Sequence, residues 1–244
     1  MTHSQSASKV SPVADLTAVT LALVFPTLLT YVYFTLLSAA PTVVQNTTYA
    51  ILKIIQFSIP LVWVRVVQRQ KLSFRADPRR GMFLSVAFGT VVLVAMWCLY
   101  KYWLLPSGRM EVALQPVRSK IEGFGVDTLA TYATLTIFYS LIHSGLEEYY
   151  WRWFVFGQLR RLRGVSLAIV VSSLGFTAHH VLLLATFFGW TSALTWIFSA
   201  AIAVGGCVWA WLYNRSGSLY GVWASHMLVD VGVFLIGFDL AGIG

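Results

Sequence analysis

Two adjacent carboxylates, Glu147 and Glu148, lie in the stretch SGLEEYYWRW, directly after a long uncharged apolar run. An ionisable group inside an apolar span is costly unless it faces a partner or a water-filled cavity. Glu148 and Arg152 are four residues apart, so on a helix they share a face and can form an ion pair. Such a pair would keep one carboxylate ionised and leave Glu147 on a neighbouring face for chemistry.

Histidines and an aspartate follow in two later apolar runs, FTAHH ending at His180 and HMLVD running from His226 to Asp230. At ~1.5 Å per helical residue from the nearest basic cluster, Glu147 lies ~20 Å deep, His180 ~25 Å and His226 ~16 Å. His226 and Asp230 are four residues apart, so both can point at one spot. Carboxylates and imidazoles that meet at one depth can activate water, stabilise an oxyanion or ligate a metal.

The composition places these groups in a membrane. The chain has 244 residues, of which 58% are hydrophobic and 11% charged, and its mean hydropathy is +0.73, so average soluble domains are excluded. The formal net charge of +8 comes from short basic clusters between apolar runs, which is typical of loops that set membrane topology. We therefore expect a lipid bilayer as the environment and no nucleic-acid partner.

The lengths of the apolar runs predict an all-α bundle of about seven transmembrane helices, within a range of six to eight, because roughly 20 apolar residues cross the hydrocarbon core. The fourth helix carries the Glu pair and continues to about Leu159. The expected spans cover residues 16–38, 49–67, 82–105, 128–146, two crossings within 164–214 divided near 188–190, and 218–238.

The spans divide the chain into three parts. Residues 1–13 are expected to be a disordered cytoplasmic lead, residues 14–124 a set of N-terminal transmembrane helices, and residues 125–244 the catalytic core. The basic loops at 66–81, 160–163 and 215 lie on one side of a seven-span arrangement. The positive-inside rule then predicts a cytoplasmic N-terminus and an external C-terminus, and we expect a multi-pass protein of a bacterial plasma membrane.

Three short motifs resemble those of a known family. EEYYWR fits the pattern EExxxR, FTAHH fits FxxxH, and HMLVD fits HxxxN/D, in the same order along the chain. Over about residues 125–240 the sequence is similar to the CAAX-protease and bacteriocin-processing family of intramembrane endopeptidases, which includes the type II CAAX prenyl proteases. The resemblance implies hydrolysis of a peptide bond in a membrane-associated or prenylated peptide or protein by glutamate-activated water, with an oxyanion site of histidine and Asn or Asp.

The resemblance also implies roles for the residues on the motif positions. Glu147 corresponds to the general base, Glu148 to its support, and Arg152 to a structural partner. His226 falls on the last motif histidine. Asp230 stands where many family members have Asn, and a buried Asp beside an anionic intermediate would repel it unless it is protonated or bonded to the histidine.

The histidine pair leaves an alternative open. His180 takes the FxxxH position when counted from Phe176, so it is the expected catalytic histidine. His179 points ~100° away on a helix; it is assigned a structural role and is the second candidate for catalysis. His143, one turn before Glu147, is interpreted as structural, and Trp151 as a residue of the membrane-interface belt.

Two other functions, and a metal site, could use the same residues. A proton- or ion-coupled transporter would also place Glu, His and Asp inside the membrane, and a non-catalytic scaffold could keep them as a packing network. We expect no required cofactor, since no helical metalloprotease spacing such as HExxH occurs. If zinc were bound, Glu147, His180 and His226 would be its three protein ligands.

Overall fold

The structure is a computed structural model, and it describes residues 10–72 and 77–243. These residues form helices connected by short turns, and no strand occurs among them. The α-helices are α1 (Pro12–Tyr31), α2 (Thr42–Val62), α3 (Met82–Leu99), α4 (Glu111–Gly123), α5 (Leu129–Ile137), α6 (Ser144–Glu148), α7 (Gly157–Arg163), α8 (Val165–Phe188), α9 (Ala193–Ser216) and α10 (Leu219–Ala241). The predicted all-α fold is confirmed.

In the described part of the chain, five π-helical segments extend or join these helices. Three of them extend α1, α2 and α3 at their C-terminal ends, at Val32–Leu36, Trp63–Val67 and Tyr100–Leu104. The other two, Phe138–His143 and Tyr149–Phe156, join α5, α6 and α7 without a break. Residues 129–163 therefore form one composite helix, in which the Glu pair lies between two π-helical segments.

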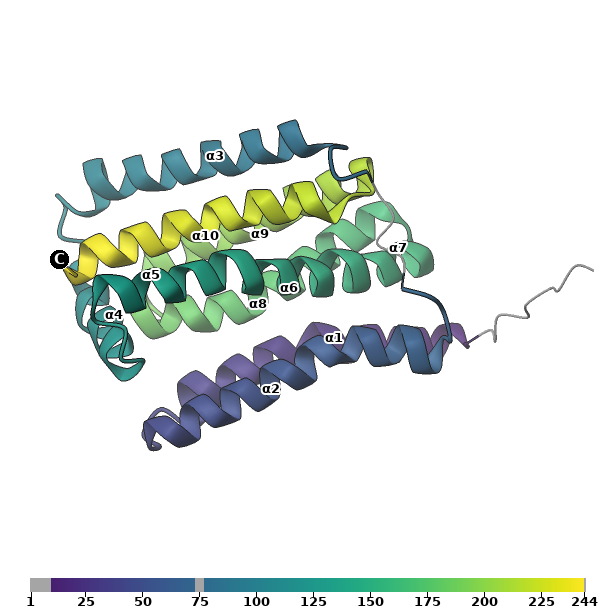
Figure 1. Ribbon diagram of the computed structural model, residues 1–244, viewed down its shortest axis with the longest axis horizontal. Coiled ribbons are helices and arrows are strands. Elements are labelled where there is room, and N and C mark those ends of the chain that lie inside the picture. Colours follow the sequence, from purple (N-terminus) through teal and green to yellow (C-terminus); the bar gives the residue numbers. More distant parts are fainter. Residues whose placement is uncertain (1–9, 73–76, 244) are drawn as a thin grey trace, which may run out of the picture.

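Within residues 10–72 and 77–243, six helices are long and apolar enough to cross a membrane. They span Pro12–Leu36, Thr42–Val67, Met82–Leu104, Val165–Phe188, Ala193–Ser216 and Leu219–Ala241. The composite helix of residues 129–163 runs alongside them (Figure 1) and corresponds to the fourth predicted crossing. The molecule is a multi-pass membrane protein, with the six crossings and the composite helix in the places that the apolar runs predict.

The first helix begins earlier than the sequence suggested. Ser11 caps α1, since its side chain accepts a hydrogen bond from the backbone N–H of Ala14 at 3.2 Å, and Pro12 takes the first helical position, where a missing N–H costs nothing. The predicted lead of residues 1–13 thus overlaps the start of α1. Residues 1–9 of that lead lie outside the described residues.

The helices are arranged around the composite helix (Figure 1). The α1–α2 pair lies on one side of it, α8 and α9 lie behind it, and α10 lies beside it with α3 on the outside. The core is aromatic: Tyr150, Trp151, Phe154 and Phe156 of the composite helix are all almost fully buried. Helix α4 lies at one end of the bundle, where it contacts α8 and α10.

Small residues hold α3 against α10. A Cβ added to Gly89 of α3 would lie 2.7 Å from the backbone oxygen of Ser225, and one added to Gly221 would lie 2.9 Å from Oγ of Ser85. The two backbones can approach this closely only because these positions lack side chains. At the far end of the pair, Nζ of Lys101 lies 2.7 Å from Oδ1 of Asp239.

Candidate active site

Four elements bring the predicted polar residues together. Glu147 and Glu148 come from α6, and Arg152 from the π-helical segment that follows it. The histidine pair comes from α8, and His226 comes from α10. Both carboxylates, Arg152 and His226 are at most 4% exposed, so contacts among them form in a dry setting where charge interactions are strong.

Glu148 is the most firmly held member of the cluster. Its Oε1 lies 2.7 Å from Nδ1 of His226 and 3.1 Å from Nη1 of Arg152. Since a carboxylate accepts, the Nδ1–H of His226 is the donor. The predicted i, i+4 ion pair is present, and Glu148 also joins α6 to α10.

Arg152 is enclosed by aromatic rings. Its guanidinium carbon lies 4.7 Å from the ring centroid of Phe176 and 5.1 Å from that of Trp209. Trp209 also stacks on the imidazole of His226, with centroids 4.4 Å apart, and donates from Nε1 to Oγ of Ser225 at 3.0 Å. These rings fix the orientation of the planar guanidinium and of the imidazole that contact Glu148.

Glu147 has a different environment, because three imidazoles surround its carboxylate. Nε2 of His143 lies 3.9 Å and Nε2 of His179 3.7 Å from Oε1, and Nε2 of His226 lies 3.8 Å from Oε2. These separations are ion-pair distances, longer than direct hydrogen bonds. The Glu147 carboxylate therefore lies close to three imidazole nitrogens, which come from three helical segments. Its oxygens can still accept a hydrogen bond from a further donor.

The two histidines of α8 have different surroundings. His179 faces Glu147 and stacks on the ring of Trp151, whereas Nδ1 of His180 lies 2.8 Å from the backbone oxygen of Phe176 in its own helix. A carbonyl accepts, so Nδ1 of His180 is the donor. Counting from Phe176 selected His180, but the rotation of α8 in the bundle turns the preceding residue toward the carboxylate.

Asp230 lies at the edge of the cluster. Its Oδ1 is 3.6 Å from Nε2 of His226, and its side chain is 22% exposed. The predicted i, i+4 pairing with His226 is present. His226 thus contacts a carboxylate through each ring nitrogen, Glu148 through Nδ1 and Asp230 through Nε2.

Several buried polar atoms of the cluster have no hydrogen-bond partner in the part of the chain that the structure describes. They are Oε2 of Glu148, Nη2 of Arg152, Nδ1 of His179, Nε2 of His143 and Nε1 of Trp151. Buried polar atoms in proteins almost always bond to protein or to water. The cluster therefore retains hydrogen-bonding capacity that its side chains do not use among themselves.

Sequence reasoning missed the aromatic part of the site. Trp151 was interpreted as a belt residue, but it is 1% exposed and stacks on His179. Trp209 and Phe176 carry no polar signal beyond apolar periodicity, so only the packing shows that they enclose Arg152. His143 was assigned a structural role, and its position one turn before Glu147 is the signal that places it within 3.9 Å of that carboxylate.

The three candidate zinc ligands, Glu147, His180 and His226, come from α6, α8 and α10. Within the described residues, no group of three or more His, Cys, Asp or Glu side chains is placed to hold a metal ion. Of the three candidate ligands, Glu147 and His226 lie 3.8 Å apart, while His180 directs Nδ1 at its own backbone.

Comparison with known protein families gives a match over the C-terminal part of the chain. Residues 129–232 match the family model of the type II CAAX prenyl endopeptidase Rce1-like proteins. No curated protein and no solved structure matches the chain. The matched segment runs from the start of α5 into α10 and contains all of the polar residues of the cluster, so the resemblance stated from the three motifs is confirmed.

Proposed function

Because residues 129–232 match the family model of the Rce1-like type II CAAX prenyl endopeptidases, we propose that the chain hydrolyses a peptide bond in a membrane-associated or prenylated protein with water activated by Glu147. One observation carries the choice of base. Glu148 is engaged by Arg152 and His226 at 3.1 and 2.7 Å, whereas Glu147 is surrounded by imidazoles at 3.7–3.9 Å. Glu147 is the carboxylate free to take a proton.

The proposed reaction needs two proton transfers and one hydrogen bond to the oxyanion. Glu147 accepts a proton from water, and the resulting hydroxide attacks the carbonyl carbon of the scissile bond. A neighbouring imidazole, His179 or His226, donates to the oxyanion that forms. When the C–N bond breaks, the leaving amine takes up the proton held by Glu147, which restores the carboxylate and consumes one water molecule.

Glu148 and Arg152 position the reacting groups. The Glu148 carboxylate fixes His226 through Nδ1–H, which leaves Nε2 directed toward Glu147 and Asp230. Arg152 supplies the positive charge that compensates Glu148 in a buried setting. Glu148, Asp230 and Arg152 therefore act on the orientation and charge of His226 and not on the scissile bond itself.

The test is a cleavage assay on Glu147→Gln. This substitution keeps the size of the side chain and removes the base, so we expect cleavage of a membrane-associated peptide to fall by about 10²–10⁴-fold while the melting temperature stays at the wild-type value. Glu122→Gln, an exposed position on α4, is the matched control and should keep full activity. Wild-type cleavage by the Glu147→Gln protein would refute the assignment of the base.

The same variant distinguishes the peptidase from the other two functions. A proton- or ion-coupled transporter carrying Glu147→Gln would lose ion flux in sealed vesicles without any effect on peptide cleavage. A scaffold would keep its cellular function in a strain that carries the substitution. Comparison of the cell's peptides between the wild-type and Glu147→Gln strains would identify the substrate as a protein that is no longer trimmed.

A further inference from the structure

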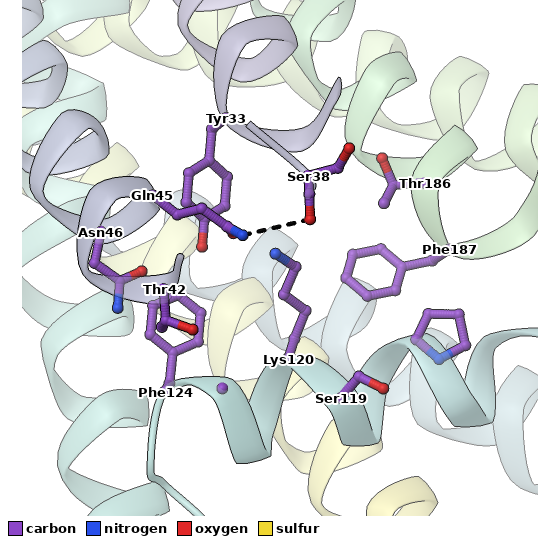
Figure 2. Close-up of a pocket in the computed structure, with 12 residues that line it drawn as sticks. Tyr33, Ser38, Thr42, Gln45, Asn46, Ser119, Lys120, Phe124, Thr186 and Phe187 are labelled. Atoms are coloured by element: carbon purple, nitrogen blue, oxygen red, sulfur yellow. Dashed lines mark hydrogen bonds between the residues drawn. The ribbon is translucent and has the colours of Figure 1, made fainter. Parts of the chain in front are cut away.

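A cavity of about 290 Å³ with mixed polar and apolar walls lies at the end of the bundle where α4 meets the α1–α2 turn (Figure 2). Its walls come from the end of the first span, the start of α2, one face of α4 and the last turn of α8. None of its lining residues belongs to the catalytic cluster. It also lies opposite the basic loops, because α8 runs from the basic Arg160–Arg163 end toward Phe187 in the cavity wall.

The cavity holds a cation without a counterion. Lys120 projects from α4 toward the α1–α2 turn (Figure 2), and its ammonium lies 4.6 Å from the ring centroid of Tyr33 and 5.0 Å from that of Phe34. Within residues 10–72 and 77–243, no carboxylate forms an ion pair with it. Burial lowers the pKa of Lys120, the direction expected for a desolvated ammonium that lacks a compensating anion.

The remaining walls suit an amphiphilic anion. The side chains of Asn46, Thr42 and Ser119 line the cavity with polar groups, while Phe124 and Phe187 supply apolar surface. A lysine ammonium binds phosphate as a point charge, and hydroxyl and amide groups can donate hydrogen bonds to phosphate oxygens. One cation, several donors and two aromatic rings match a phosphate attached to an apolar molecule.

The depth of the cavity along the membrane-spanning helices indicates which molecule carries such an anion. It lies where the spans Pro12–Leu36, Thr42–Val67 and Val165–Phe188 begin or end, which is the depth of lipid headgroups in a bilayer. Lysine side chains near the ends of transmembrane helices reach the level of the lipid headgroups. We propose that the cavity binds the phosphate headgroup of an anionic glycerophospholipid through Lys120.

The test measures binding of phosphatidylglycerol to the full-length detergent-purified protein by native mass spectrometry. Lys120→Gln removes the charge and should weaken binding by about tenfold or more, the effect of losing one charge-assisted hydrogen bond. Lys120→Arg should retain binding. Arg118→Gln, an exposed position on the same helix, is the matched control and should bind as wild type.

A second variant tests the cavity without altering charge. A Cβ at Gly123, which lines the cavity, meets no heavy atom within 4 Å, so Gly123→Leu should fold while its side chain fills part of the space and weakens lipid binding. Gly205→Leu, where a Cβ also meets no atom within 4 Å, is its control. Unchanged phosphatidylglycerol binding in both Lys120→Gln and Gly123→Leu would overturn the proposal.

Two further binding measurements distinguish a lipid phosphate from a soluble phosphate. Phosphatidylcholine, whose headgroup has no net charge, should bind more weakly than phosphatidylglycerol, and inorganic phosphate at the same concentration should not displace the lipid. Displacement by inorganic phosphate would assign the cavity to a soluble anion and overturn the lipid proposal. Since no catalytic residue lines the cavity, this outcome is independent of the cleavage assay on Glu147→Gln.

Discussion

Arg152 is a buried charged residue that depends on its neighbours for compensation of its charge. It is 2% exposed, lies between the rings of Phe176 and Trp209, and has one carboxylate, that of Glu148, at ion-pair distance. A buried ion pair adds little net stability, but removal of one partner leaves an uncompensated charge. The stability of the protein should therefore depend on Arg152 more than on any surface arginine.

Arg152→Ala should lower the free energy of unfolding by about 3–5 kcal/mol, because it leaves Glu148 buried without its cation. Activity should fall with it, since Glu148 orients His226. Arg152→Lys should rescue little, as an ammonium cannot reproduce a planar group stacked between two rings. Thermal melting in detergent beside the cleavage assay measures both effects, with exposed Arg163→Ala as control; a wild-type melting temperature for Arg152→Ala would contradict the structural role.

The two histidines of α8 should respond differently to substitution. His179→Ala removes the imidazole 3.7 Å from Glu147, so we expect at least about a hundredfold loss of cleavage, the size of one acid–base or oxyanion contribution. His180→Ala removes a side chain bonded to its own helix and should keep substantially more activity. Cleavage rates and melting temperatures of the two variants test this prediction. A larger loss of cleavage in His180→Ala than in His179→Ala would support His180 as the catalytic histidine.

At the residue level, spacing predicted some contacts and could not predict others. The i, i+4 rule is local, so it foretold the contacts of Glu148 with Arg152 and of His226 with Asp230. The bond from His226 to Glu148 joins two helices 78 residues apart, and it depends on how those helices pack. Sequence patterns carry no such information, and for the same reason they could not choose between neighbouring histidines.

At the scale of elements, hydropathy located the helices but did not describe their internal geometry. Uncharged length depends only on composition, so the ends of the predicted spans agree with most helices to within a few residues. The π-helical segments at Phe138–His143 and Tyr149–Phe156 were not foreseen, because hydropathy does not report the hydrogen-bond register. Helix α4 was also missed: no helix was expected between the spans 82–105 and 128–146, yet burial of Ala113 and Ile121 stabilises one there.

The contact between α3 and α10 affects the site through the chain. Gly89→Ala would place a Cβ 2.7 Å from the backbone oxygen of Ser225, the residue before His226. The helices must separate, and overpacking of this kind costs about 1–3 kcal/mol. We expect a lower melting temperature and reduced cleavage.

Gly205→Ala is the control for this contact, because a Cβ there meets no heavy atom within 4 Å. It should melt and cleave as wild type. Equal melting temperatures for the two alanine variants would show that α3 does not position α10.

At the scale of the whole molecule, the two ends of the bundle differ in charge. Arg160, Arg161, Arg163 and Arg215 lie at one end, and the turn after α3, with Ser107, lies at the other (Figure 1). The positive-inside rule places the basic end in the cytoplasm. The orientation remains a prediction, and it fixes the leaflet from which lipid would reach the cavity around Lys120.

Cysteine labelling in intact cells tests the orientation. In a background with Cys98→Ala and Cys207→Ala, Ser107→Cys should react with a membrane-impermeant maleimide, because the turn after α3 is expected outside the cell. Arg163→Cys should react only after the cells are permeabilised. Both positions are exposed in the structure, so exchanged labelling would mean that the protein is inserted the other way.

The length of the spanning helices has a consequence for the choice of membrane. Helix α8 has 24 residues, which at a rise of ~1.5 Å per residue gives ~36 Å, whereas a typical hydrocarbon core is ~30 Å thick. Mismatch of this sign is accommodated by tilting of helices or local thickening of the bilayer. Because Glu147, His179 and His226 lie on three different helices, a change in helix tilt would change the distances between the Glu147 carboxylate and the two imidazoles. The thickness of the host bilayer thereby becomes a variable that sets the geometry of the site.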